Sequence, residues 1–364
     1  MYTDTVAVIG AGNGGYAMAG DLASRGYKIK FYEHPNFKDN FTNMLKNKKI
    51  TVIEGEEQKT VDITTVTTDI KEALDGVNIV NLVVPSTIQR CFFKEIVKGI
   101  SKGQIVVIWA GRFGSVEFLS FLKENHIDLD FIITETDTLP YGARMIGPQK
   151  VNILYRSLRL YVSSIPTDKK EVTQQLLGEM FEGVKVIENV LAVAFSNPAL
   201  LVYGVGALLN VARIQHTNGN FYLFEEGITD AVAEVMHKAY SEITAVAIFL
   251  GFKIPVYLRE DFDGPTSLEG ICFKSPKGNQ DFKKMNGPRS INGRYMMENI
   301  GDALVPITEL GKIVGIDTPV LDSIITLGSI VCKVNFRKEG RNLAKLGLAG
   351  INQKEIINKI VDRL

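Results

Sequence analysis

The first half of the chain alternates short apolar runs with stretches whose apolar positions repeat at helical spacing. Such alternation is typical of a doubly wound α/β fold with a mostly parallel sheet. Parallel strands read as continuous apolar runs because helices cover both faces of the sheet. The runs that we predict as strands lie at residues 6–9, 27–32, 78–86, 104–109 and 131–134, and residues 151–164 are predicted to add extended strands that complete the sheet.

From about residue 187 the pattern changes to longer segments that each carry one apolar helical face. These segments are residues 191–211, 229–250, 300–314 and 318–331. We therefore predict two domains. Residues 1–186 form a dinucleotide-binding Rossmann domain, and residues 187–364 form an all-α domain for substrate binding and dimerisation.

One stretch, residues 264–292, interrupts the helical pattern. It is rich in Gly, Pro, Ser, Asn and Lys and has no clean period. Loops of this length inside a compact domain are usually functional or disordered. Because the stretch leads directly into Arg294, two interpretations stay open: a lid over a cleft, or a surface insertion.

The first predicted strand runs into a glycine-rich loop of the form G-x-G-x-x-G. A helical segment and a second strand follow the loop, so the motif stands in the βαβ context that binds dinucleotides. Gly10 permits a tight turn, Gly12 lets the backbone approach a pyrophosphate, and Gly15 lets helix and strand pack closely. The helix start offers free N–H groups and a positive dipole end to the phosphates. We expect Asn13 and Gly14 to belong to the same cofactor-binding loop.

Glu33 ends the second strand, at the position that selects the cofactor. A carboxylate there accepts the hydroxyls of the adenosine ribose and repels a 2′-phosphate, which favours NAD over NADP. The adjacent His34 and the nearby Lys38 keep NADP open as an alternative, and a solvated acid at a strand end is the purely structural interpretation.

Residues at the carboxyl ends of the other strands are further candidates, because ligands of such folds bind beyond those ends. Glu135 has two interpretations: it orients the nicotinamide amide, or it caps the next turn. The strand-end residues that we predict to bind the cofactor are Val84, Pro85, Ser86, Gly111 and Glu135.

Composition narrows the class of protein. The 364 residues carry 41 basic and 41 acidic side chains, and no basic stripe indicates nucleic acid. Three scattered cysteines suit a reducing compartment, and the four histidines do not form a metal-binding pair. The first strand begins too early for a signal peptide, and the apolar stretch 190–212 is interrupted by Ser196-Asn197-Pro198, as in a buried helix. We therefore expect a cytoplasmic protein with no metal, membrane or nucleic-acid partner.

Several separated motifs together resemble the octopine/nopaline (opine) dehydrogenase family. The resemblance extends over nearly the whole chain, and the later motifs are more specific than the glycine-rich loop. The motifs lie at residues 10–15, 135–144 (like E-T-x-x-L-P-Y-x-x-R), 208–214, 224–229, 294–299, 304–306, 318–319 and 346–351.

The resemblance implies a Rossmann domain followed by a helical domain of the 6-phosphogluconate-dehydrogenase type. It also implies hydride transfer from NAD(P)H to the imine that a 2-oxo acid forms with an amino acid. In this family a His held by an Asp is the acid/base, because His titrates near working pH. By analogy, a homodimer is expected.

The chain departs from the family at both positions of that pair. The His falls on Tyr203 and the Asp falls on Asn299, so these two residues occupy the predicted acid/base position. Arg294 and Arg144 stay in recognisable motifs, and a guanidinium fork suits a substrate carboxylate. The structural alternatives are an ion pair with Glu298 for Arg294 and bracing of the sheet edge for Arg144. Asn197, in an apolar helix, is a further catalytic candidate, with core hydrogen bonding as its alternative.

Three functions remain open on the sequence alone. The first is an NAD(P)-dependent dehydrogenase of opine type with an altered acid/base. The second is a 2-oxo acid reductase resembling ketopantoate reductase. The replacement of the His–Asp pair favours this function, whereas the absence of a lysine, the usual catalytic residue of such reductases, between residues 197 and 214 argues against it. The third is an inactive dinucleotide-binding sensor. All three bind small molecules, the first two a 2-oxo acid.

Overall fold

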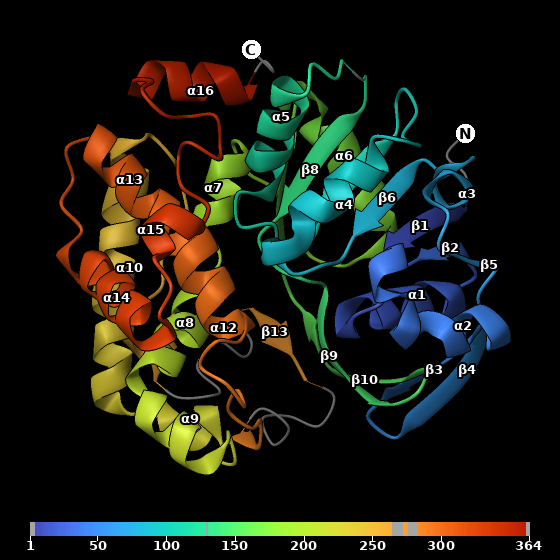
Figure 1. The fold of residues 1–364 in the computed structure, drawn as a ribbon, viewed down its shortest axis with the longest axis horizontal. Coiled ribbons are helices and arrows are strands. Elements are labelled where there is room, and N and C mark those ends of the chain that lie inside the picture. Colours follow the sequence, from blue (N-terminus) through green and yellow to red (C-terminus); the bar gives the residue numbers. More distant parts are fainter. Residues whose placement is uncertain (1–3, 129, 264–271, 276–282, 362–364) are drawn as a thin grey trace.

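The computed structural model describes residues 4–128, 130–263, 272–275 and 283–361. Figure 1 shows an α/β half at the right and a helical half at the left, with the C-terminal helix α16 (Gln353–Val361) at the top over the helical half. The predicted lid 264–292 falls mostly outside the described residues, so the two interpretations of it stay predictions.

An eight-stranded sheet forms the centre of the α/β half. It has the order β12-β11-β8-β7-β6-β1-β2-β5, and its pairs are parallel except β11 with β8. Strands β6 and β7 are buried along their whole length, as continuous apolar runs predict. The strands are β1 (Thr5–Ile9), β2 (Lys28–Tyr32), β5 (Thr65–Thr67), β6 (Ile79–Leu82), β7 (Ile105–Ile108), β8 (Ile132–Thr136), β11 (Leu160–Ile165) and β12 (Val184–Val186).

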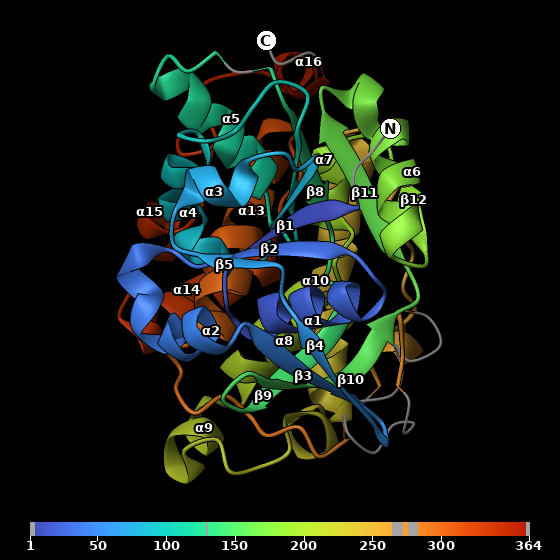
Figure 2. The ribbon, with the colours of Figure 1, turned by 90° about the vertical axis from the view of Figure 1, so that its right-hand side faces the viewer.

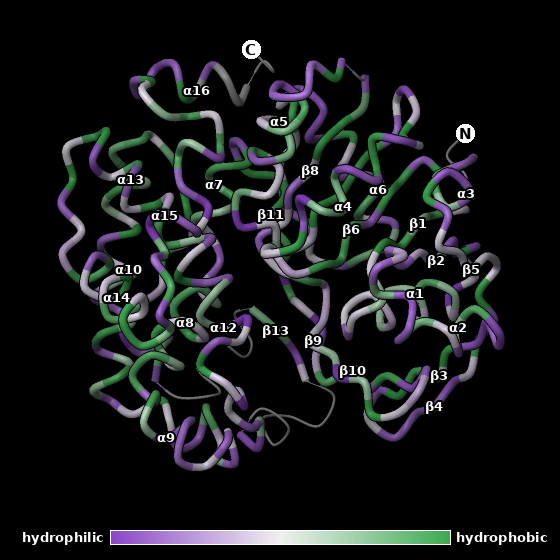
Figure 3. Tube along the Cα trace, viewed as in Figure 1, coloured by the Kyte–Doolittle hydropathy of each residue, from purple (hydrophilic) through white to green (hydrophobic). Residues whose placement is uncertain are grey.

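Helices cover both faces of this sheet and bury two separate apolar clusters. On one face, α1 (Asn13–Ser24) and α6 (Lys170–Met180) cover the cluster that contains Phe31 and Trp109. On the other face lie α3 (Ile70–Leu74), α4 (Gln89–Ile96) and α5 (Gly114–Glu124), and this second cluster continues into the helical half. In Figure 3 the central strands β1 and β6 are mostly green, whereas peripheral segments such as α9 (Val211–Thr217) carry much purple. The predicted α/β fold is confirmed.

A smaller sheet packs across α1 from the main sheet. It has the order β13-β10-β3-β4, with β9 also paired to β10, and Figure 2 shows α1 between the two sheets. The prediction for residues 151–164 was wrong in one respect, because β10 joins this second sheet and only β11 joins the main one. The strands are β3 (Lys49–Glu54), β4 (Glu57–Asp62), β9 (Tyr141–Gly147), β10 (Lys150–Ser157) and β13 (Phe273–Lys274).

The helical half corrects two predictions about helix continuity. The helix expected at 191–211 is broken after α7 (Val190–Phe195), because Pro198 cannot donate an N–H and Asn197 caps the next helix. The helix expected at 300–314 begins earlier, as wide π-helical turns at Met297–Leu304. The remaining helices are α8 (Ala199–Leu209), α9, α10 (Asp230–Phe249), α12 (Arg294–Met296), α13 (Val305–Ile313), α14 (Pro319–Cys332), α15 (Phe336–Glu339) and α16.

The stretch Val190–Leu209 is long and apolar enough to cross a membrane by length and composition, but 89% of its most apolar window is buried inside the protein. That burial agrees with the predicted core helices. Strand β13 belongs to the second half of the chain yet pairs with β10 of the first half. The two halves are therefore joined by backbone pairing as well as by side-chain packing.

Candidate active site

The glycine-rich loop has the geometry that a dinucleotide requires. Gly10 has a φ of +101°, and a Cβ on Gly15 would lie 1.7 Å from the carbonyl oxygen of Gly10. A Cβ on Gly12 would meet nothing within 4 Å, and Gly12 begins α1 without a side-chain cap. The first amides of α1 therefore remain available, and the residues fit a bound pyrophosphate.

Glu33 lies beside this loop, as predicted, and its carboxylate is buried. Oε2 accepts a hydrogen bond from the Ala11 amide at 2.8 Å, and Oε1 accepts one from the His34 amide at 2.7 Å. Burial raises the pKa of Glu33, and the two amide donors oppose that shift. His34 is itself buried and lies 3.9 Å from Glu95, so it is turned away from solvent, whereas a 2′-phosphate ligand needs an open cation.

A cavity of about 910 Å³ opens next to the loop, between the two halves of the chain. Its lining includes Asn13 and Gly14, and Asn13 accepts a hydrogen bond from the Met145 amide at 2.9 Å. The other walls come from the loops after β7 and β8, from β9, β10 and β13, from α8 and from residues 285–299. The cavity therefore lies where the nicotinamide end of a dinucleotide would face a substrate.

The structure brings both predicted arginines to this cavity. The Arg294 side chain is 54% exposed, and its Nε lies 3.4 Å from Oε1 of Glu298. That carboxylate raises the pKa of Arg294. Arg144 is exposed, donates to its own neighbour Ala143 at 2.9 Å, and lies 3.7 Å from the sulfur of Met285. Both guanidinium groups keep donors free for a carboxylate.

Tyr203 also lines the cavity, but it stands among other aromatic rings. Its ring centre is 4.7 Å from that of Tyr295 and 5.9 Å from that of Phe224. Burial raises the pKa of Tyr203 well above its usual value, and Tyr155 and Tyr295 add to the effect. The phenol is therefore protonated at neutral pH, and its hydroxyl is hydrogen-bonded to the neighbouring Tyr155.

Asn299 is buried and is held by neighbours on both sides. Its amide nitrogen donates to the Tyr295 carbonyl at 2.8 Å, and its oxygen accepts from Nε of Arg112 at 3.3 Å. Arg112 also pairs with Glu298 at 3.1 Å. The sequence reasoning missed Arg112, although it follows a strand end between Gly111 and Gly114, and it considered Glu298 only as a structural partner of Arg294.

Asn197 is placed at the cavity wall, where its side chain has structural bonds. It donates to the Asp137 carbonyl, and its oxygen accepts from the Ala199 amide at 2.9 Å, which caps α8. Asp137 is buried and pairs with Arg159 at 2.6 Å. The geometry favours the structural interpretation of Asn197 over the catalytic one.

Other strand-end residues support the site from behind. Glu135 is fully buried and accepts hydrogen bonds from the amides of Phe113 and Ser115, both at 2.8 Å. A Cβ on Gly111 would lie 2.5 Å from the Glu135 carboxyl carbon, so the loop needs glycine there. These contacts favour the cap interpretation of Glu135, and its binding of the cofactor stays a prediction.

The segment Val84–Pro85–Ser86 also supports the site from behind the cavity. Val84 packs against Gly10, where a Cβ would come within 2.4 Å of its methyl group. Ser86 is buried and donates to Asp302 of the helical half at 2.7 Å. In the described residues these three do not line the cavity, and the Ser86 hydroxyl joins the two halves of the chain.

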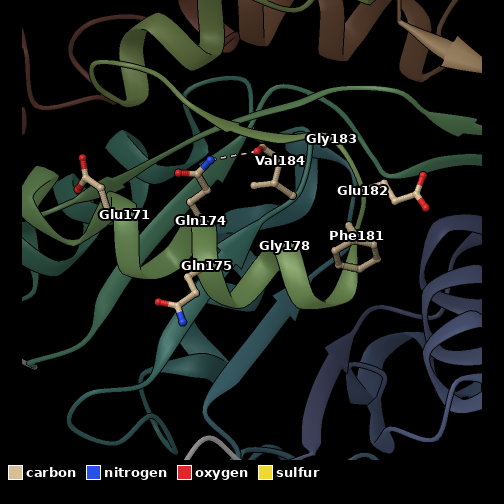
Figure 4. Close-up of a pocket in the computed structure, with 8 residues that line it drawn as sticks. All are labelled: Glu171, Gln174, Gln175, Gly178, Phe181, Glu182, Gly183 and Val184. Atoms are coloured by element: carbon tan, nitrogen blue, oxygen red, sulfur yellow. Dashed lines mark hydrogen bonds between the residues drawn. The ribbon is translucent and has the colours of Figure 1, made fainter.

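A second hollow, of about 440 Å³, lies on the outer side of α6, far along the chain from the glycine-rich loop. Figure 4 shows Gln174 bonded to the Val184 carbonyl there, with Glu171 and Glu182 at the rim. It brings together none of the predicted site residues. In the part of the chain that the structure describes, no group of three or more His, Cys, Asp or Glu side chains could hold a metal ion.

Comparisons with known proteins agree with this geometry. The family model described as the alpha-helical domain of NAD/NADP octopine/nopaline dehydrogenase matches residues 186–332. The model described as the N-terminus of NAD-dependent glycerol-3-phosphate dehydrogenase matches residues 5–116. The chain is 28% identical to opine dehydrogenase of Arthrobacter sp. (strain 1C) over 95% of its own length and 96% of that protein.

Solved structures show the same fold. Octopine dehydrogenase, described with NADH and pyruvate, superposes with a TM-score of 0.70 at 19% identity, covering 97% of each chain. A ketopantoate reductase from Ralstonia eutropha superposes with a TM-score of 0.59 at 20% identity, covering 90% of this chain and 98% of the other. A Rossmann-like domain followed by a helical domain is common to these proteins.

Proposed function

We propose that this chain, an NAD(P)-dependent oxidoreductase related along its whole length to the opine dehydrogenases, reduces a 2-oxo acid or the imine that this acid forms with an amino acid. One observation carries the proposal. The cavity that contains Asn13 and Gly14 of the glycine-rich loop also contains Arg144 and Arg294, so cofactor and carboxylate anchors share one space.

The charges that line the cavity favour an anionic substrate. Both acids of the lining are already paired, Asp137 with Arg159 and Glu298 with Arg112. In the part of the chain that the structure describes, no ion pair is found for Arg144. The arginines of the lining are Arg112, Arg144, Arg159, Arg289 and Arg294. An excess of guanidinium groups suits a substrate with one or two carboxylates, as an oxo acid and an opine have.

The proposed roles follow from position. NADH, when bound, supplies the hydride. The amides at the start of α1 hold its pyrophosphate, and Glu33 binds the adenosine ribose, which favours NAD over NADP. Arg294 and Arg144 anchor the carboxylate. Tyr203 donates a hydrogen bond in the position where the family resemblance implies a histidine.

Reduction of a plain 2-oxo acid, as in ketopantoate reductase, is the second candidate. One observation favours it: among the described residues that line the cavity there is no histidine, and Asn299 replaces the acid that would orient one. Ketone reduction has no imine to build, so it makes smaller demands on acid/base groups than reductive condensation does.

Further proposals concern the setting of the enzyme. The pattern of the chain supports the boundary at residue 186 and the roles of the two domains, and the three scattered cysteines support a cytoplasmic location. The homodimer is proposed from the family resemblance alone. A small-molecule substrate, with neither nucleic acid nor membrane as partner, is part of the same proposal.

The test is oxidation of NADH and NADPH by the purified protein with pyruvate or ketopantoate, each with and without a mixture of amino acids. Turnover that requires amino acids would support reductive condensation. Turnover with the oxo acid alone would support the second candidate. Cofactor binding without turnover of either oxo acid would contradict both and favour a sensor.

A further inference from the structure

The loop after β7 is strained and is held in place by buried charges. Ala110, Arg112 and Phe113 adopt left-handed φ values of 51°, 51° and 67°, which side chains other than glycine rarely take. Such strain persists only where the surroundings over-determine it, and it concentrates at functional sites. The strain therefore indicates that the loop after β7 has a functional role separate from that of the glycine-rich loop.

Two buried ionic groups fix the loop from behind. Glu135 accepts from the amides of Phe113 and Ser115, as described above. Arg341, which is 2% exposed, donates to the Gly111 carbonyl at 2.9 Å and to the Arg112 carbonyl, and it pairs with Glu117 at 2.6 Å. Because the backbone is held at several points, the Arg112 side chain leaves the loop in a defined direction.

The Arg112 guanidinium uses part of its donor set on the protein. Its Nε donates to Asn299 at 3.3 Å, and its Nη1 donates to the Ala110 carbonyl at 3.1 Å and pairs with Glu298 at 3.1 Å. No hydrogen bond donated by Nη2 is found in the described residues, and Nη2 is not among the buried atoms that lack a partner. Since Arg112 lines the cavity, Nη2 is the donor that the cavity can use.

Glu298 connects this inner arginine to an outer one. The carboxylate is 1% exposed, with Oε2 on Arg112 and Oε1 at 3.4 Å from Nε of Arg294. Arg112 is only 9% exposed, whereas Arg294 is 54% exposed. One carboxylate therefore lies between two guanidinium groups, one deep in the cavity and one near its opening. Its Oε1 has no hydrogen-bond partner in the described residues, so it acts on Arg294 through charge.

We infer that Arg112 binds the oxygen of the 2-oxo group while Arg294 binds the adjacent carboxylate, with Glu298 as the positioning residue for both. This inference rests on the proposed function. The oxo and carboxylate groups of a 2-oxo acid sit on neighbouring carbons, which suits two guanidinium groups that share one carboxylate. The deep arginine meets the oxygen on the reacting carbon, and the outer one meets the carboxylate charge that persists throughout.

The role is electrostatic. When a hydride adds to the carbonyl carbon, the electron pair of the C=O bond moves to the oxygen, and the oxygen then takes a proton from water. A guanidinium keeps its protons and stabilises the negative charge as it develops. Asn299 suits this arrangement, because Glu298 already neutralises Arg112 and a second carboxylate would compete with the substrate.

The experiment measures equilibrium binding of pyruvate and of propionate, which lacks the oxo group, to the protein loaded with NAD⁺. We expect the unmodified protein to bind pyruvate about tenfold more tightly than propionate, the size of one hydrogen bond to a charged donor. In Arg112→Gln this preference falls to within about twofold, and the affinity for propionate changes only as far as Arg294 shifts through their shared partner Glu298. A purely structural role would weaken both ligands equally.

Two further variants serve as a control and as a second test of Arg112. Arg156→Gln removes an arginine whose ion pairs with Asp21 and Glu54 lie outside the cavity lining, and it should retain the full preference for pyruvate. Arg112→Lys is the second variant, because it keeps the charge if Arg112→Gln does not fold, and it should lose most of the preference since a point charge replaces the fork. A preference for pyruvate that survives in either Arg112 variant, or that is missing in the unmodified protein, overturns the inference.

The binding measurement tests the role of Arg112, and the turnover measurement tests the proposed function, so each can be contradicted without the other. If the unmodified protein discriminates between the two acids through Arg112 but turns over neither pyruvate nor ketopantoate, the proposed function falls and the oxo-binding role of Arg112 stands. If turnover occurs while Arg112→Gln keeps the discrimination, the proposed function stands and Arg112 is excluded as the oxo-binding group.

Discussion

The cofactor end and the substrate end of the site are built in different ways. At the cofactor end, Gly10, Gly12 and Gly15 lie within one turn and the start of one helix, and the tightest contact among them, between Gly15 and the Gly10 carbonyl, is local in sequence. At the substrate end, Arg112 meets Asn299 across 187 positions of the chain. The cofactor end can be recognised as a sequence motif, whereas the substrate end combines residues that are far apart in the sequence. Substitutions can test this contrast, because the two ends should fail in different measurements.

The largest effect is expected at the cofactor end from Gly15→Ala. The new methyl group would lie 1.7 Å from the Gly10 carbonyl, so helix and strand must separate. We expect a loss of at least about 3 kcal/mol in stability and no measurable NADH binding. Thermal unfolding and NADH fluorescence titration would show it. Gly178→Ala is the matched control, because a Cβ there meets nothing within 4 Å, and it should leave NADH binding intact.

Arg294→Ala should give the next largest effect, confined to the substrate end. Losing a charge-assisted anchor costs about 2–3 kcal/mol, which is a rise of about 30- to 150-fold in the KM of the oxo acid. The Kd of NADH should change less than about twofold, because the glycine-rich loop is untouched. Steady-state kinetics and cofactor titration on the same preparation separate the two quantities. Equal losses in both would show that Arg294 supports the fold and does not anchor substrate.

Glu33→Gln should have a smaller effect, at the cofactor end alone. The amide keeps one acceptor for the Ala11 N–H, and it removes the charge that repels a 2′-phosphate. We expect the ratio of NADH to NADPH affinity to fall about tenfold, with the KM of the oxo acid unchanged. Competitive titration of the two cofactors gives the ratio. An unchanged ratio would mean that Glu33 only braces the loop.

Tyr203 should give the smallest effect, and its pH dependence is the informative part. Because burial raises the pKa of the phenol, Tyr203 stays protonated from pH 6 to 9 and adds no step to the rate profile in that range. Tyr203→Phe should lower kcat about three- to tenfold through one lost hydrogen bond, with NADH affinity constant. Tyr203→His should add a step near pH 6.5. A neutral-range step in the unmodified protein that disappears in Tyr203→Phe would contradict this account.

The success of prediction from the sequence also differs between the cofactor end and the substrate end. The α/β class, the helical half, the glycine-rich loop and the family resemblance were predicted and are confirmed. Both arginines of the motifs reach the cavity. Glu135 shows where prediction stops: a strand-end acid serves equally well as a ligand or as a cap, and only the burial of both oxygens decides between them.

The missed features share a physical cause. The small sheet escaped prediction because β4 is mostly exposed and carries polar residues, which leaves no continuous apolar run to detect. The break between α7 and α8 depends on an asparagine cap that competes with an apolar helical pattern. Arg112 carried no signal beyond its place after a strand, since its role depends on Glu298 and Asn299, which the chain brings to it only on folding.

The sequence by itself determined the cofactor class, because the backbone geometry that binds a pyrophosphate needs glycine at fixed spacing between a strand and a helix, and both the spacing and that context can be read from the sequence. It also determined the two kinds of domain, because the apolar period reports which face of each element is buried. Only the tertiary structure decided which charges face the substrate. Glu298, Arg112 and Arg294 become one unit through ion pairs between distant segments, and periodicity along a chain carries no information about such pairs.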